Sequence, residues 1–133
     1  MDKVKLVAIL RGIQSGEAAE HIAALIDTGF RYIEIPLNSP DWQQSIPAMV
    51  RQFGERAVIG EGTVLKVEQV DFLAEAGAKL IVTPNTAPAV IRRAVDKGML
   101  VCAGCATASE AFSALDAGAQ WLKIFPSSAF GPD

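Results

Sequence analysis

The amino-acid sequence predicts an α/β fold built on a parallel sheet, and two observations support this prediction. Short runs rich in valine, isoleucine and leucine alternate with longer segments whose apolar residues recur at three- and four-residue spacing. Each longer segment ends at a glycine, and these glycines stand about 20 to 25 residues apart, at Gly29, Gly54, Gly77, Gly98 and Gly118. The even repeat favours a TIM (β/α)8 barrel, here truncated to about six βα units.

The predicted strands are apolar on both faces, which is typical of strands covered by helices on one side and packed inside on the other. Three of the strands follow the same pattern, in which a glycine and three further residues precede an apolar run that ends in proline. Two examples are TGFRYIEIPLNSP and AGAQWLKIFPSS. The six expected strands cover residues 6–10, 32–36, 58–62, 80–83, 100–103 and 121–125.

Five helices are expected between these strands, and none after the last strand. Glycine ends each helix because it adopts the left-handed conformation without a Cβ clash. Ser39, Thr86 and Thr107 offer side-chain oxygens as N-caps. A strand–helix repeat of this kind produces a parallel sheet with right-handed crossovers.

A doubly wound open sheet is the competing architecture. It would usually place a G-x-G-x-x-G turn after the first strand, where this sequence has RGIQSGE. A complete barrel needs eight strands, and only six are evident. Residues 1–133 are therefore expected to form a single domain, the N-terminal part of a barrel with strands seven and eight absent.

Composition limits the classes of partner. Half of the 133 residues are hydrophobic, so the chain can bury a core, and its net charge of −3 argues against a nucleic-acid partner. No apolar run approaches the ~20 residues of a membrane span, and the first residues lack the basic leader and cleavage site of a signal peptide. We expect a cytoplasmic protein without a membrane partner.

Cys102 and Cys105 form a C-x-x-C spacing and are expected to be reduced. A redox site would need a thioredoxin-like frame, and a zinc site would need two more ligands. The chain has no other cysteine and a single histidine, His21. We therefore expect two small residues around a strand end, and neither a metal nor a cofactor.

The candidate catalytic residues are Glu34 and Lys123, because each interrupts an apolar strand five residues after its lead glycine. In an eight-stranded barrel the second and sixth strands face each other across the axis, so the two side chains would point inward at similar height. A buried ion pair without catalytic function is the alternative.

Burial would lower the pKa of Lys123 and increase the population of its neutral amine. A neutral lysine can attack a ketone and form a Schiff base, while a nearby carboxylate moves the protons that the reaction requires. This pair predicts a class I aldolase or a related lyase. A metal-dependent lyase would require a cluster of His, Asp and Glu ligands, and none is evident in the sequence.

Four more residues are candidates for substrate binding. Arg11 follows the first strand and offers a planar fork to a carboxylate, or else faces solvent. Thr63 follows two glycines that let the backbone approach a ligand, or else caps the next helix. Glu61, between those glycines, is left without an assigned face. The remaining two candidates are expected to form the pocket wall: Pro84 and Phe125.

Several motifs together resemble the 2-dehydro-3-deoxy-6-phosphogalactonate and 2-dehydro-3-deoxy-6-phosphogluconate aldolases. They are LVAILRG, RYIEIPLNSP, IGEGTVL, LIVTPN, GCAT and LKIFPSSAFGP, and they extend over essentially the whole chain. The LRG and PLNSP motifs look like the galactonate branch, and the gluconate branch is the alternative.

The resemblance implies reversible cleavage of a phosphorylated keto-deoxy sugar acid to pyruvate and glyceraldehyde 3-phosphate, in galactonate catabolism. It also implies a homotrimer when full length. It assigns the Schiff base to Lys123, acid–base catalysis to Glu34 and substrate binding to Arg11 and Thr63. The substrate phosphate would be bound beyond the sixth strand, so an inactive fragment or assembly module is a further alternative.

Overall fold

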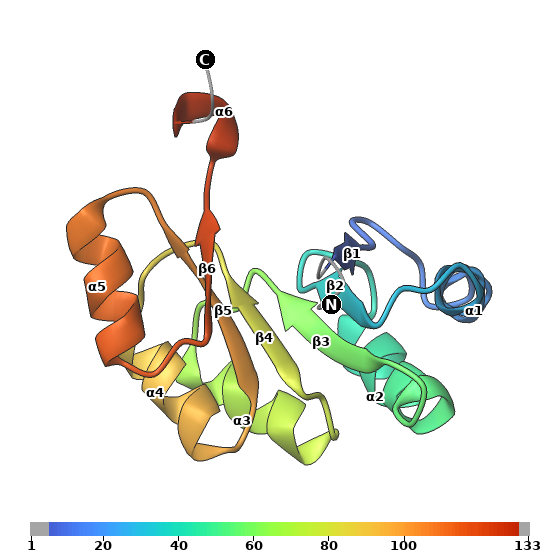
Figure 1. The fold of residues 1–133 in the computed structure, drawn as a ribbon. Helices are drawn as coiled ribbons and strands as arrows, with labels where there is room; N and C mark the ends of the chain where they lie inside the picture. The colour runs from blue at the N-terminus through green and yellow to red at the C-terminus, as the bar shows by residue number, and fades with distance from the viewer. Residues whose placement is uncertain (1–5, 131–133) are drawn as a thin grey trace.

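The computed structural model describes residues 6–130, which contain one sheet of parallel strands (Figure 1). Neighbours in sequence are neighbours in the sheet, from the first strand to the sixth. The second, third and fourth strands have the bounds predicted from the sequence, and the other three differ by one or two residues at an end. The strands are β1 (Val7–Ile9), β2 (Tyr32–Pro36), β3 (Val58–Gly62), β4 (Leu80–Thr83), β5 (Leu100–Cys105) and β6 (Trp121–Ile124).

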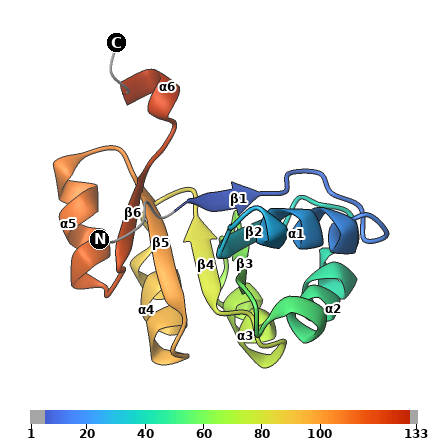
Figure 2. The same cartoon turned by 45° about the vertical axis from the view of Figure 1, so that its right-hand side comes forward.

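The prediction of a truncated eight-stranded barrel is wrong. The strands form an open half-barrel, in which β1 pairs with β2 and β6 pairs with β5 but the two edge strands do not pair with each other over the described residues. Figures 1 and 2 show the resulting curved sheet. The sequence repeat specifies each strand–helix unit and the order of neighbours, whereas barrel closure depends on pairing between the two ends of the sheet.

Five helices lie in an arc around the outer, convex face of the sheet (Figure 2). In the described part of the chain, no helix lies in front of the opposite, concave face (Figure 2). None of the described helices is long and apolar enough to cross a membrane. The helices of the arc are α1 (Ala18–Asp27), α2 (Trp42–Phe53), α3 (Val67–Glu75), α4 (Pro88–Asp96) and α5 (Ala108–Asp116).

A short helix, α6 (Ser127–Phe130), follows β6, so the prediction of no helix there is wrong. Most of the predicted helix-ending glycines are confirmed, because Gly29, Gly77, Gly98 and Gly118 have positive φ. Gly54 is the exception and stays right-handed, with φ −60°.

Of the three predicted N-caps, only Thr107 is confirmed. Its Oγ1 accepts the N–H of Glu110 at 3.1 Å, within a capping box. Ser39 and Thr86 instead donate to backbone carbonyls near the carboxyl ends of other strands. Ser39 donates to the Leu10 carbonyl at 3.4 Å, and Thr86 donates to the Gly104 carbonyl at 2.7 Å.

The main hydrophobic core lies between the sheet and the helices. Ile33 and Ile35 of β2 are fully buried in it, together with Ile81 of β4. Since successive side chains of a strand point to opposite faces, Tyr32 and Glu34 belong to the concave face. One face of β2 therefore packs into the hydrophobic core, and the opposite face carries the ionisable side chain.

Candidate active site

Glu34 lies on the concave face with 3% of its surface exposed. The neighbouring strand β3 makes room for it, because Gly60 and Gly62 lie beside Glu34 and Pro36 in the parallel register. A Cβ atom on Gly62 would overlap the Glu34 carboxylate. The glycines that flank Glu61 thus let the carboxylate lie directly against the backbone of β3.

The charges around Glu34 show which other candidates lie near it. Burial raises the pKa of Glu34, and the positive charges of Lys123 and Arg11 oppose this rise. The structure therefore brings Glu34, Lys123 and Arg11 together, although they come from three different strands or strand ends. A carboxyl group with a raised pKa is suited to both accepting and donating a proton near neutral pH.

Lys123, which the sequence indicated as a buried amine, is half-buried in the structure. The reason is that β6 is an edge strand of the half-barrel, where Leu122 and Ile124 are 37% and 54% exposed. Lys123 lies beside Gly104 of β5 in the register. Its Nζ is 4.7 Å from the centroid of the Phe125 ring, which places one predicted wall residue against the amine.

The sequence interpretation placed Cys102 at a strand end but gave it no role in this site. Burial raises the pKa of its thiol, the charge of Lys123 lowers it, and the charge of Glu34 raises it again. Cys102 and Cys105 are both free thiols. The signal that could have identified Cys102 is its position: it precedes Gly104 by two residues and so shares its face of β5.

An aromatic pair lies below the charged groups. The rings of Tyr32 and Trp121 meet edge to face, with centroids 5.0 Å apart and planes at 80°. Tyr32 precedes Glu34 by two residues, and Trp121 precedes Lys123 by two residues. The rings therefore form the floor of the concave site, one layer closer to the strand starts than the two charged groups.

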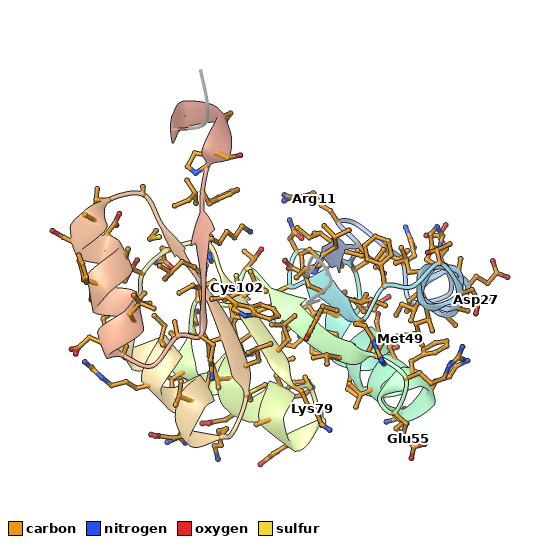
Figure 3. The ribbon with its side chains drawn as sticks, in the orientation of Figure 1. Arg11, Asp27, Met49, Glu55, Lys79 and Cys102 are labelled. Atoms are coloured by element: carbon orange, nitrogen blue, oxygen red, sulfur yellow. The ribbon has the colours of Figure 1, made fainter. Side chains whose placement is uncertain are left out.

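The remaining candidates lie at the carboxyl ends of the strands. Arg11 follows β1 and is exposed; Figure 3 shows it at the upper end of the sheet, whereas Glu55 and Lys79 lie at the lower end. Thr63 is exposed and has a φ of 61°. It does not cap α3, because Lys66 occupies that N-cap position. Pro84 follows β4.

Pro84 is linked to the site through Gly104. A Cβ atom on Gly104 would overlap the Pro84 backbone, so the two segments touch. Gly104 in turn lies beside Lys123 in the register. Pro84 therefore touches β5 at the residue that lies beside Lys123 of β6.

Glu61, which the sequence left unassigned, points away from the site. It lies beside Ile35 and Ile81 in the register, and both belong to the core under the helices. Glu61 is fully buried, and among residues 6–130 neither of its carboxylate oxygens has a hydrogen-bond partner. Burial and the charge of Glu34 raise its pKa to about 10, although the nearby Gly62 N–H partly opposes this rise. At neutral pH the group is an uncharged acid.

The arrangement combines an amine and a carboxyl group with a raised pKa on the concave face with a guanidinium at the carboxyl end of β1. Within residues 6–130, no group of three or more His, Cys, Asp and Glu side chains could hold a metal ion. The groups present can therefore supply a nucleophile, a proton carrier and an anion-binding side chain.

Comparison with known proteins identifies relatives over the whole chain. The family model for KDPG and KHG aldolase matches residues 1–132. The 2-dehydro-3-deoxy-6-phosphogalactonate aldolase of Escherichia coli is 67% identical over 130 residues, which are 98% of this chain and 63% of that protein. A probable 2-dehydro-3-deoxy-6-phosphogalactonate aldolase of Rhizobium meliloti is 51% identical over 127 residues, which are 96% of this chain and 60% of that protein.

A solved structure described as native KDPGal has a TM-score of 0.95 and 66% identity, and the match covers 99% of this chain and 64% of that one. The chain thus spans about three fifths of the length of the curated relatives that it matches.

Proposed function

The chain belongs to the KDPG and KHG aldolase family, and we propose that it carries the Schiff-base chemistry of a class I aldolase. The proposed substrate is 2-dehydro-3-deoxy-6-phosphogalactonate, the compound in the name of the Escherichia coli relative. Cleavage would yield pyruvate and glyceraldehyde 3-phosphate. The observation that supports the proposal is that Lys123 lies near enough to Glu34 for its charge to lower the pKa of that buried carboxyl group.

Lys123 is the proposed nucleophile. Its neutral amine attacks the C2 ketone of the substrate, and loss of water from the carbinolamine leaves an imine. The imine then accepts the electrons of the C3–C4 bond when that bond breaks. This releases the aldehyde and leaves an enamine on Lys123, which is protonated at C3 and hydrolysed to pyruvate.

Glu34 is the proposed proton carrier. The reaction requires a proton to leave the carbinolamine nitrogen, a proton to reach its hydroxyl, and a proton to leave the C4 hydroxyl during cleavage. A carboxyl group that alternates between both protonation states can perform all three transfers. Its raised pKa, caused first by burial, favours this alternation near neutral pH.

The other four residues are proposed to hold the substrate. Arg11 lies close enough to lower the pKa of Glu34, so it can also bind the carboxylate next to the reacting ketone. Thr63 offers a hydroxyl directly after the glycines that support Glu34. Phe125 lies against the Lys123 amine and Pro84 touches Gly104 beside Lys123, so both are proposed to exclude water from the imine.

We further propose that residues 1–133 form one domain, that the full-length protein is a homotrimer, and that it acts in the cytoplasm in galactonate degradation. The two free cysteines support a reducing compartment. Sedimentation of the full-length protein measures the trimer, and a dimer or monomer at micromolar concentration would contradict it.

Trapping of the imine tests the proposed function. Borohydride reduction in the presence of pyruvate should add a stable three-carbon adduct, and peptide mass analysis should locate it at Lys123. The matched control is Lys79, an exposed lysine at the other end of the sheet, which should remain unmodified. An unmodified Lys123 in the full-length protein would reject the proposal. Cleavage rates on the galactonate and gluconate substrates then identify the branch.

A further inference from the structure

The Tyr32–Trp121 ring pair connects two strands that are not neighbours in the sheet. Tyr32 belongs to β2 and Trp121 to β6, and the sheet route between them passes through β3, β4 and β5. Their ring centroids are nevertheless only 5.0 Å apart. The pair, which we call the aromatic bridge, therefore crosses the concave face directly.

The aromatic bridge has a fixed relation to the two proposed catalytic residues. Each ring stands two residues before one of them on the same strand, Tyr32 before Glu34 and Trp121 before Lys123. Side chains two residues apart share a face and lie about 7 Å apart along the strand. A shift of either ring across the concave face thus moves the adjacent charged group in the same direction.

The sheet alone leaves this separation poorly determined. The rotation between adjacent strands varies by roughly 10 to 35°, so small changes accumulate over the four strand pairs from β2 to β6. In this half-barrel β6 has a strand partner only on its β5 side within the described residues. Two of its four side chains are exposed, Leu122 at 37% and Ile124 at 54%.

We propose that the aromatic bridge is a positioning device that sets the separation of Glu34 and Lys123. The effect expected on the reaction rate rests on the proposed Schiff-base function. In that function the Glu34 carboxyl group must lie within reach of the Lys123 adduct to transfer protons. Neither ring is a catalytic residue, since both lie one layer below the reacting atoms and act through the neighbouring positions.

The kinetic test compares variants that remove the ring contact with variants that keep it. Trp121→Leu and Tyr32→Leu each remove it from one side, and both should slow formation of the trapped pyruvate imine by about tenfold or more. Trp121→Phe retains an aromatic contact and should restore most of the rate. Measuring both leucine variants keeps the test valid where one of them does not fold.

The structure offers a matched control for loss of an aromatic pair. Trp42 of α2 and Phe72 of α3 meet in the same edge-to-face geometry, with centroids 5.4 Å apart and planes at 81°. Trp42→Leu removes a comparable contact on the helical side of the molecule. It should lower the unfolding midpoint without changing the rate of imine trapping per folded molecule.

A second measurement does not depend on aldolase activity. The charge of Lys123 lowers the pKa of Glu34, so Lys123→Met should raise that pKa in the parent protein. Carbon-13 NMR titration of the Glu34 carboxyl group measures this rise. In the Trp121→Leu background the same substitution should produce a clearly smaller rise, because the two groups are no longer held together.

The outcomes separate the two proposals. A parent protein without a pyruvate adduct rejects the Schiff-base function and leaves the NMR experiment to decide on the aromatic bridge. An equal effect of Lys123→Met on the Glu34 pKa in the parent and in folded Trp121→Leu protein rejects the aromatic bridge. Unchanged imine trapping in both folded leucine variants also rejects it.

Discussion

Replacement of Glu61 by glutamine should stabilise the protein in a pH-dependent manner. The Glu61 carboxyl is fully buried beside Ile35 and Ile81, and its pKa rises from 4.5 to about 10 on folding. Between these values the unfolded chain has released the proton, whereas the folded protein retains it. Folding therefore takes up a proton, and the free energy of unfolding falls as the pH rises above 4.5.

The size of the effect follows from the two pKa values. Each pH unit above 4.5 lowers the free energy of unfolding by about 1.4 kcal/mol. At pH 7 the protein is therefore less stable by about 3 kcal/mol than it would be if this side chain did not titrate. Glutamine has nearly the same shape and does not titrate. The Glu61→Gln variant should match the parent near pH 5 and exceed its stability by about 3 kcal/mol at pH 7.

Urea unfolding followed by tryptophan fluorescence at pH 5, 6, 7 and 8 measures this difference. Glu55→Gln provides the control, because it makes the same side-chain change at an exposed carboxylate in the turn after α2. The difference between Glu61→Gln and the parent should grow steadily with pH, while the Glu55→Gln difference stays nearly constant. A Glu61→Gln advantage that is independent of pH would refute the reasoning.

Four further substitutions address the site and the scaffold. Lys123→Arg keeps the charge but cannot form an imine, so the borohydride adduct and turnover should both disappear; retained turnover would remove Lys123 as the nucleophile. Glu34→Gln should lower kcat at least about a hundredfold with a smaller change in pyruvate binding, and an unchanged kcat would exclude Glu34 from proton transfer. Gly62→Ala should displace the Glu34 carboxylate and lower kcat, and a shorter side chain in Gly62→Ala/Glu34→Asp should recover part of the loss; no recovery would contradict the overlap. Thr107→Ala should cost about 1 kcal/mol in urea unfolding because it removes the α5 N-cap, whereas an unchanged midpoint would show that the cap contributes little.

Local features of the fold were predictable because they depend on residues close in sequence. The alternation of apolar runs and helical periodicity located β2, β3 and β4 to the residue. The same pattern identified Glu34 and Lys123, because a charged side chain inside an apolar strand stands out without any knowledge of its surroundings. Ser39 and Thr86 could not be predicted in this way, because their hydroxyls bond to carbonyls of segments distant in sequence rather than to the helices that follow them.

The sequence by itself determined the strand–helix units, their parallel order and the two ionisable residues that the proposed chemistry needs. Only the tertiary structure decided that the sheet remains an open half-barrel, that Lys123 is half-buried on an edge strand, and that Glu61 points into the helical core. Only the tertiary structure brought Tyr32 against Trp121. The physical reason is that periodicity reports one segment at a time, whereas closure, burial and cross-sheet contacts depend on how the curvature of all six strands adds up.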